Sequence, residues 1–170
     1  MLVKEKDRKN KYRNLKKYKD KKIFLETDVN DDEEKIFIKV FNEKNIRKRY
    51  ELIYDYTWEY LDKNVCILCD FKGDKCISNR LNKSVHNVNG CCYFNNKKCE
   101  FLKNNKCTRP NITCKLFMCS YIENKVLKKK SVPKNYLLLN YFLNGKQKKI
   151  LKSSFKVLKQ DVIDELIKNK

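Results

Sequence analysis

Cysteine is the residue type in this sequence that could support the most chemistry, because its thiol can bind metals, form disulfides and take part in redox reactions. The chain has nine cysteines, and all of them lie in one part of the sequence. They are Cys66, Cys69, Cys76, Cys91, Cys92, Cys99, Cys107, Cys114 and Cys119. Cysteines that serve only as small apolar core residues would be scattered along the chain. The clustering therefore indicates a shared local role: disulfide bonding, metal ligation or redox chemistry.

Metal ligation explains this cluster best. An odd number of cysteines and the lack of a secretion signal disfavour a disulfide framework. A loop-rich segment of this size buries too little apolar surface to offset the conformational entropy lost on folding. A thiolate-bound metal supplies the missing stability, about 10–16 kcal/mol for structural zinc. We therefore expect residues 66–122 to form a cysteine-rich metal-binding lobe.

The cysteine spacing constrains the site without defining it. Cys66 and Cys69 form a Cys-x2-Cys pair, whose sulfurs reach one tetrahedral ion. Cys91 and Cys92 are adjacent and would point to opposite faces of an extended strand, so they serve different ions or only one is a ligand. His86, the only histidine, is a candidate extra ligand. The nine thiols could fill two four-thiolate sites or hold one cluster, and both zinc and an iron–sulfur cluster fit.

Short motifs around the later cysteines have a family resemblance. They are Gly90-Cys-Cys-Tyr-Phe94, Cys99-Glu-Phe-Leu102, Lys106-Cys107, Arg109-Pro110 and Cys114-Lys-Leu-Phe-Met-Cys119. These motifs resemble the CxxCxxCC-type cysteine-cluster family of zinc- or iron-chelating proteins, and a similar block occurs in flagellin lysine methylases. The resemblance implies metal chelation by Cys91, Cys92, Cys99, Cys107, Cys114 and Cys119. Val85 and Val88 stand where the family has its first two cysteines, and Cys66, Cys69 and Cys76 lie upstream as substitutes.

The net charge of +20 suits an anionic partner such as nucleic acid. Positive charge is spread over 1–22, 66–122 and 123–170, whereas 23–65 is acidic. This distribution is typical of a generally cationic, solvated surface. A nucleic-acid-binding zinc domain is the alternative, with contacts from residues inside the cysteine segment. The candidates for those contacts are Arg80, Lys83, Arg109 and Lys115.

No catalytic constellation is visible. The glycines at positions 73, 90 and 145 are isolated, so there is no Gly-rich phosphate loop, and the carboxylates of 28–34 are typical of a solvated acidic turn. We expect a metal-binding protein rather than an enzyme, of undefined molecular role. An iron–sulfur enzyme of redox or methyl-group chemistry is a further alternative.

The beginning of the sequence lacks the apolar run of a secretion signal, because charged residues follow Met1-Leu2-Val3 directly. No apolar run is long enough for a membrane span. We therefore expect a cytoplasmic protein without a membrane partner. The sequence does not indicate its oligomeric state.

The elements around the cysteine segment are mainly helical. A stripe of Ile46, Tyr50, Ile53 and Thr57 predicts a helix over 43–62. Residues 36–41 fit either a strand, by β-branched and aromatic content, or a helix that begins in the acidic residues before it. Further helices are predicted over 135–143, 148–158 and 161–167, the last capped by Asp161.

These elements predict an α+β fold that is mostly helical, with the loop-rich cysteine metal lobe inserted between helical segments. Residues 1–22 would be a basic arm or frayed helix, and 23–65 an N-terminal α/β part. Residues 123–170 would be a C-terminal helical part that packs on 43–62.

Overall fold

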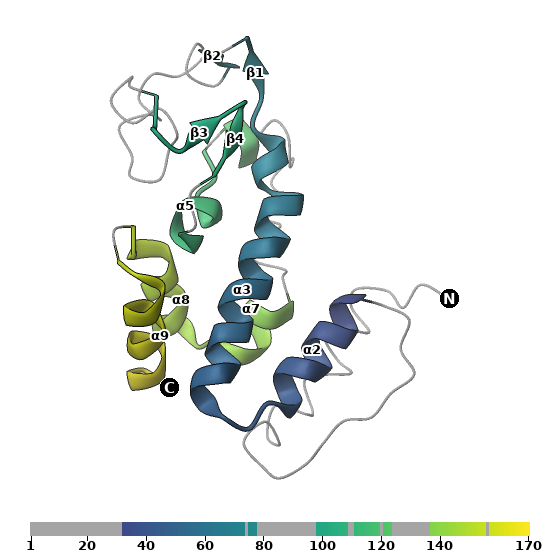
Figure 1. The fold of residues 1–170 in the computed structure, drawn as a ribbon, viewed down its shortest axis with the longest axis vertical. Helices are drawn as coiled ribbons and strands as arrows, with labels where there is room; N and C mark the ends of the chain where they lie inside the picture. Colours follow the sequence, from purple (N-terminus) through teal and green to yellow (C-terminus); the bar gives the residue numbers. More distant parts are fainter. Residues whose placement is uncertain are drawn as a thin grey trace.

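The computed structural model of this chain describes residues 32–73, 75–77, 98–108, 111–119, 121–123, 137–155 and 157–170. Helices dominate this part, and two small antiparallel sheets of two strands each accompany them (Figure 1). The mostly helical α+β class is therefore confirmed. The predicted basic arm at 1–22 lies outside the described residues.

The elements follow one another in a simple order. They are α2 (Asp32–Asn42), α3 (Ile46–Asn64), the 3-10 turn η2 (Cys66–Leu68), β1 (Phe71–Lys72), β2 (Lys75–Cys76), β3 (Leu102–Lys103), β4 (Lys106–Cys107), α5 (Ile112–Leu116), α7 (Leu137–Phe142), α8 (Gly145–Ser153) and α9 (Lys159–Lys168).

Helix α2 decides the question that the sequence left open at 36–41. Its first turn holds Asp32, Glu33 and Glu34, whose negative charge favours the positive end of the helix dipole. The expectation of a solvated acidic turn is therefore wrong for residues 32–34. They begin a helix, and Glu34 is buried.

Helix α3 is the long helix predicted over 43–62, displaced slightly towards the C-terminus. It begins after Asn45, whose side chain accepts a hydrogen bond from the Lys48 amide, as an N-cap does. Its buried face includes Tyr50, Ile53, Thr57 and Leu61. The helical spacing of these residues therefore marks the side that faces the core.

The C-terminal helices differ from the prediction at their ends. Helix α8 begins after Asn144, where a capping box with Gln147 satisfies two backbone amides, and it ends at Ser153 rather than continuing to 158. Asp161 is not the cap of α9, because the helix already begins at Lys159 after Leu158. Asp161 instead lies in the first turn, where its charge favours the helix dipole.

The core lies between α3 and the other helices. Phe37 of α2 packs edge-on against Tyr141 of α7, with ring centres 4.8 Å apart, and lies 5.5 Å from Phe142. Helix α9 packs along α3 and brings in Val162, Ile163 and Leu166. Within the described ranges, no helix is both long and apolar enough to cross a membrane.

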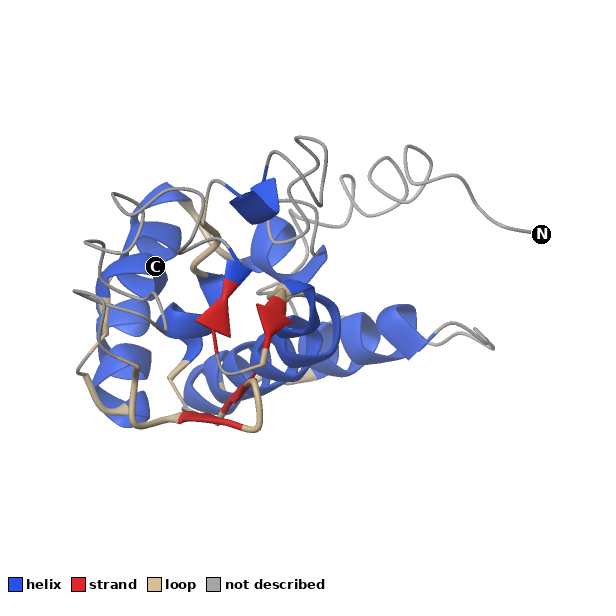
Figure 2. Ribbon diagram, turned by 90° about the horizontal axis from the view of Figure 1, so that it is seen from above, coloured by secondary structure: helices blue, strands red, loops and turns tan. Residues whose placement is uncertain are grey.

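Both hairpins lie at one end of α3, away from α2 and α9 (Figure 1). Figure 2 looks down on this end and shows the strands in front of the helices. We call residues 66–77 and 98–108 the hairpin region. It is the part of the described chain that carries most of the cysteines.

Candidate metal centre

Seven of the nine cysteines lie on described elements near the hairpin end of α3. Cys66 begins η2 directly after α3, and Cys69 follows η2; Cys76 is in β2 and Cys107 in β4. Cys99 precedes β3, Cys114 is in α5 and Cys119 follows it. The other predicted site residues lie outside the described ranges: Cys91, Cys92, His86, Arg80, Lys83 and Arg109.

The two hairpins hold their cysteines at matching positions. Cys76 pairs with Phe71 across the first hairpin, and Cys107 pairs with Leu102 across the second. Both turns use positive φ angles, 60° at Gly73 and 48° and 61° at Asn104 and Asn105. Glycine and asparagine tolerate this conformation best, so these sequences permit tight turns that place a cysteine on each second strand.

Cys66 and Cys107 are electrostatic neighbours, although they are far apart in the sequence. Burial is the main cause that raises the pKa of Cys66 to about 11, against a usual value of 9.0. The Lys115 ammonium opposes this shift, and a negative charge on Cys107 would add to it. The pairing arises because η2 and β4 pack together, so the thiols are brought together by tertiary structure.

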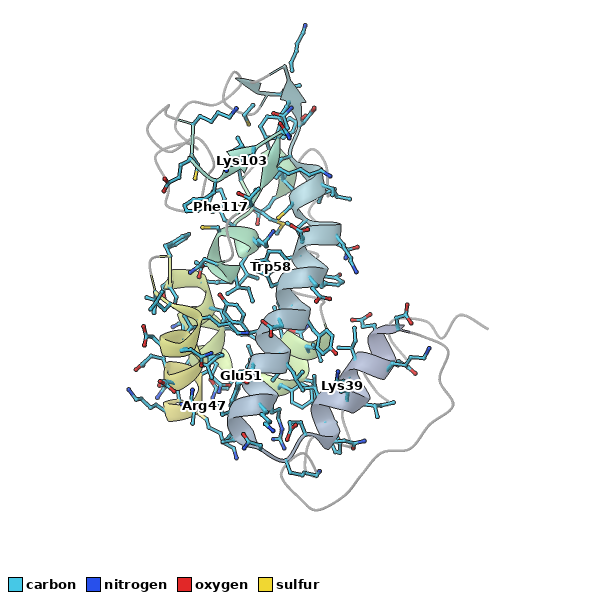
Figure 3. All side chains as sticks on the ribbon, viewed as in Figure 1. Lys39, Arg47, Glu51, Trp58, Lys103 and Phe117 are labelled. Atoms are coloured by element: carbon cyan, nitrogen blue, oxygen red, sulfur yellow. The ribbon has the colours of Figure 1, made fainter. Side chains whose placement is uncertain are left out.

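Lys115 fills the space between these two cysteines and α3. Its side chain is 0% exposed and forms an ion pair with Asp62, which is 46% exposed. Its Nζ lies 3.8 Å from Cys66 Sγ, 3.5 Å from the Cys107 carbonyl oxygen and 4.1 Å from the centre of the Trp58 ring. Figure 3 labels Trp58 on the side of α3 towards α5. The ammonium is thus held by a carboxylate, a carbonyl, a thiol and an aromatic face.

This burial corrects the prediction that Lys115 contacts nucleic acid. A side chain with no exposed surface does not reach a phosphate on a bound strand. This burial could not be predicted from sequence, because nothing near Lys115 along the chain indicates contact with Asp62 and Cys66. Trp58 and Asp62 were likewise missed, although their spacing of four residues along a helix puts them on one face.

Cys76 and Cys119 form a second group around Tyr121. The Tyr121 hydroxyl donates a hydrogen bond of 3.2 Å to Asp70 Oδ2. That hydrogen bond is the main cause that raises the pKa of Tyr121, and negative charge on Asp70, Cys119 and Cys76 acts in the same direction. The two thiols are therefore close enough to the same hydroxyl to affect its ionisation.

Cys114 lies in α5, which packs on α3 and α8. Its electrostatic neighbour is Tyr54 of α3, whose pKa is raised mainly by burial, with smaller contributions that include Cys114. The Tyr54 hydroxyl accepts a hydrogen bond of 3.1 Å from the Ile112 amide at the start of α5. Helix α5 is thereby fixed against α3, with Cys114 on one side and Lys115 beside Cys66.

We call two groupings the cysteine pairs: Cys66 with Cys107, which acts on its pKa, and Cys76 with Cys119, which both act on the pKa of Tyr121. Among the described residues, no three Cys, His, Asp or Glu side chains lie close enough to hold one metal ion. No disulfide joins two of the seven cysteines that the structure describes. The pairs bring together thiols from different elements, which the sequence spacing alone did not predict.

Comparison with known proteins gives no family for this chain: no protein-family model, curated protein or solved structure matches it.

Proposed function

We propose that this chain is a metal-binding protein whose cysteine lobe, residues 66–122, lies between the helical segments and holds zinc or an iron–sulfur cluster. The observation that carries the proposal is that Cys107 acts on the pKa of Cys66 where η2 packs on β4, while Cys76 and Cys119 both act on the pKa of Tyr121. Thiolates are the ligands that both zinc and iron–sulfur clusters prefer. The resemblance to zinc- or iron-chelating proteins agrees with this proposal.

The short strands of the two hairpins support the proposal that a bound metal stabilises them. Each hairpin has strands of only two residues, and an isolated two-stranded hairpin is at best marginally stable in water. A metal bound by cysteines from both hairpins would hold them in place, because binding free energy becomes folding free energy in such domains. We therefore propose a structural role for the metal, without catalysis.

The two cysteine pairs favour two centres over one. Each pair supplies half of a four-thiolate site, and the remaining ligands would come from the other cysteines of the lobe. The candidates among the described residues are Cys69, Cys99 and Cys114. Outside the described residues they are Cys91 and Cys92, and His86 is a possible extra ligand. The reducing cytoplasm, in which thiols persist, is the compartment that we propose.

Lys115 suits a thiolate centre beside it. A buried ammonium needs compensating negative charge, which Asp62 supplies only from a half-exposed position. Metal binding deprotonates thiols, and a Cys66 thiolate 3.8 Å away would provide a second anion. Groups that contact metal ligands in this way commonly tune metal affinity.

The experiment is a comparison of metal content among cysteine variants of the full chain. Cys107→Ser and Cys119→Ser each remove one member of a pair. With two centres, each variant should lose about half of the bound metal, because one centre remains intact. With a single centre, both variants should lose nearly all of it.

Ile67→Ser is the matched control. Ile67 lies between Cys66 and Cys69 and its side chain is 65% exposed, so this variant changes the same segment without removing a thiol. It should keep its full metal content. Unchanged metal content in both cysteine variants would contradict the proposal.

A further inference from the structure

The two hairpins share a pattern beyond their cysteines. One reads Phe71-Lys-Gly-Asp-Lys-Cys76 and the other Leu102-Lys-Asn-Asn-Lys-Cys107. In both, a lysine precedes the turn and another follows it, and these lysines are direct cross-strand partners: Lys72 with Lys75, and Lys103 with Lys106. The same placement of lysines thus occurs twice, at the same register, although the first turn also holds Asp74 where the second has Asn105.

This arrangement does not serve the stability of the hairpins. Like charges directly opposite each other on antiparallel strands are destabilising, and strands of two residues have few other contacts to compensate. Lys72, Lys103 and Lys106 are exposed. Within the described part of the chain, none of these three forms an ion pair with a carboxylate. No described carboxylate balances their charge, so this charge attracts external anions; Asp74, in the first turn, lies outside the described residues.

The turns of the two hairpins meet, which brings the strands that carry these lysines close to one another. Asn105 Nδ2 donates a hydrogen bond of 3.3 Å to the Gly73 carbonyl oxygen. Beside this contact is an open hollow of about 830 Å³, lined by Gly73, Lys98, Leu102, Lys103, Asn104 and Asn105. Figure 3 labels Lys103 in this region. We call Lys72, Lys103, Lys106 and the two asparagines the hairpin-tip surface.

The composition of the hairpin-tip surface selects its partner. Peripheral membrane binding is strongest where apolar side chains enter the lipid. No large apolar side chain of the described residues within 71–76 and 102–107 is exposed, and Ile67, which is 65% exposed, precedes the first hairpin. Lysine is depleted at protein–protein interfaces. Lysine and asparagine, by contrast, are common contacts to the phosphates of nucleic acids.

We propose that the hairpin-tip surface binds the phosphate backbone of a nucleic acid. The nearby carboxylates of Asp70 and Glu100 precede the first strand of each hairpin, at the end away from the turn, and Asp70 is engaged by the Tyr121 hydroxyl. The surface differs from the contacts predicted from sequence, and it does not depend on the identity of the metal.

The test measures binding of the full chain to a fluorescent 20-base-pair DNA duplex by anisotropy, at several salt concentrations. The triple variant Lys72→Gln, Lys103→Gln, Lys106→Gln should bind at least about tenfold more weakly in moderate salt. Because each lost phosphate contact lowers the slope of log affinity against log salt by about 0.9, that slope should fall by about 2 to 3.

The matched control removes the same charge elsewhere. Lys146→Gln, Lys149→Gln, Lys152→Gln changes three exposed lysines of α8, and this variant should bind almost as the unchanged chain does. A third variant with arginine at positions 72, 103 and 106 keeps the charge and should retain binding. It tests the surface even if the glutamine variant fails to fold.

Three results would overturn the proposal. One is equal weakening by the two glutamine triples, which would mean that net charge alone drives binding. Another is the absence of binding by the unchanged and arginine chains at low salt. The last is binding to vesicles of phosphatidylserine and phosphatidylcholine in preference to the duplex.

Discussion

A half-buried thiol, Cys66, lies beside a fully buried ammonium, Lys115, in the described structure. Lys115 Nζ lies 3.8 Å from Cys66 Sγ, and the packing of η2, α5 and α3 buries Lys115 fully and Cys66 in part. Burial favours the neutral form of the thiol, whereas the ammonium favours its anion. Burial has the larger effect, so the thiol is protonated near neutral pH in the absence of metal.

This balance predicts slow alkylation of Cys66 in the reduced, metal-free protein. With a pKa of about 11 rather than 9.0, its thiolate fraction at pH 8 is on the order of a hundredfold lower, and the thiolate is the nucleophile. Iodoacetamide should modify Cys66 at least about tenfold more slowly than the exposed Cys69, as measured by mass spectrometry of peptides. The rate at Cys66 should rise with pH until about 11.

The same shift has a defined effect on stability. In the unfolded chain the thiol ionises near 9, but in the folded chain it keeps its proton to about 11. The folded state therefore binds more protons between these values, and stability falls as pH rises through this window. For the alkylation experiment, equal rates at Cys66 and Cys69 would contradict the raised pKa of Cys66.

The helices are held in their relative positions by core packing and by hydrogen bonds of buried polar side chains. Gln147 is the clearest example, because it connects three helices. Its Nε2 donates to the Tyr50 hydroxyl at 2.6 Å and to the Leu166 carbonyl oxygen at 2.7 Å. Its Oε1 accepts from the Asn144 amide at 2.9 Å. One buried side chain thus caps α8 and links it to α3 and α9.

Replacing Gln147 by leucine should destabilise the protein by about 2–4 kcal/mol, because three buried or half-buried polar groups lose their partner. Urea unfolding followed by circular dichroism measures this loss. Lys149→Leu makes the same kind of change on the exposed face of α8 and should change stability by no more than about 0.5 kcal/mol. Equal effects of the two substitutions would contradict this account of the helix junction.

Elements with sustained periodicity could be predicted from sequence, and others could not. The stripe of Tyr50, Ile53 and Thr57 is long enough to define α3. The hairpins have strands of two residues, so no alternation of apolar and polar residues marks them; the turn pairs Gly73-Asp74 and Asn104-Asn105 were the available signal. The boundaries of α8 and α9 were missed because side-chain capping and tertiary contacts set them.

At the scale of the whole molecule, the described cysteines and the apolar core lie in different parts of the structure. Aromatic and aliphatic residues of α2, α3, α7 and α9 form the core, and the seven described cysteines lie towards the hairpin end of α3. The sequence located the cysteine segment because clustering needs no knowledge of the fold. It did not group Cys66 with Cys107 or Cys76 with Cys119, since their electrostatic proximity depends on how η2, the hairpins and the segment after α5 pack.

The most direct test of the metal proposal is elemental analysis of the full chain purified without oxygen, combined with titration of its thiols. The proposal predicts stoichiometric zinc or iron and thiols that react only after a chelator or acid removes the metal. Protein that contains neither metal, with all nine cysteines reacting at once, would contradict it.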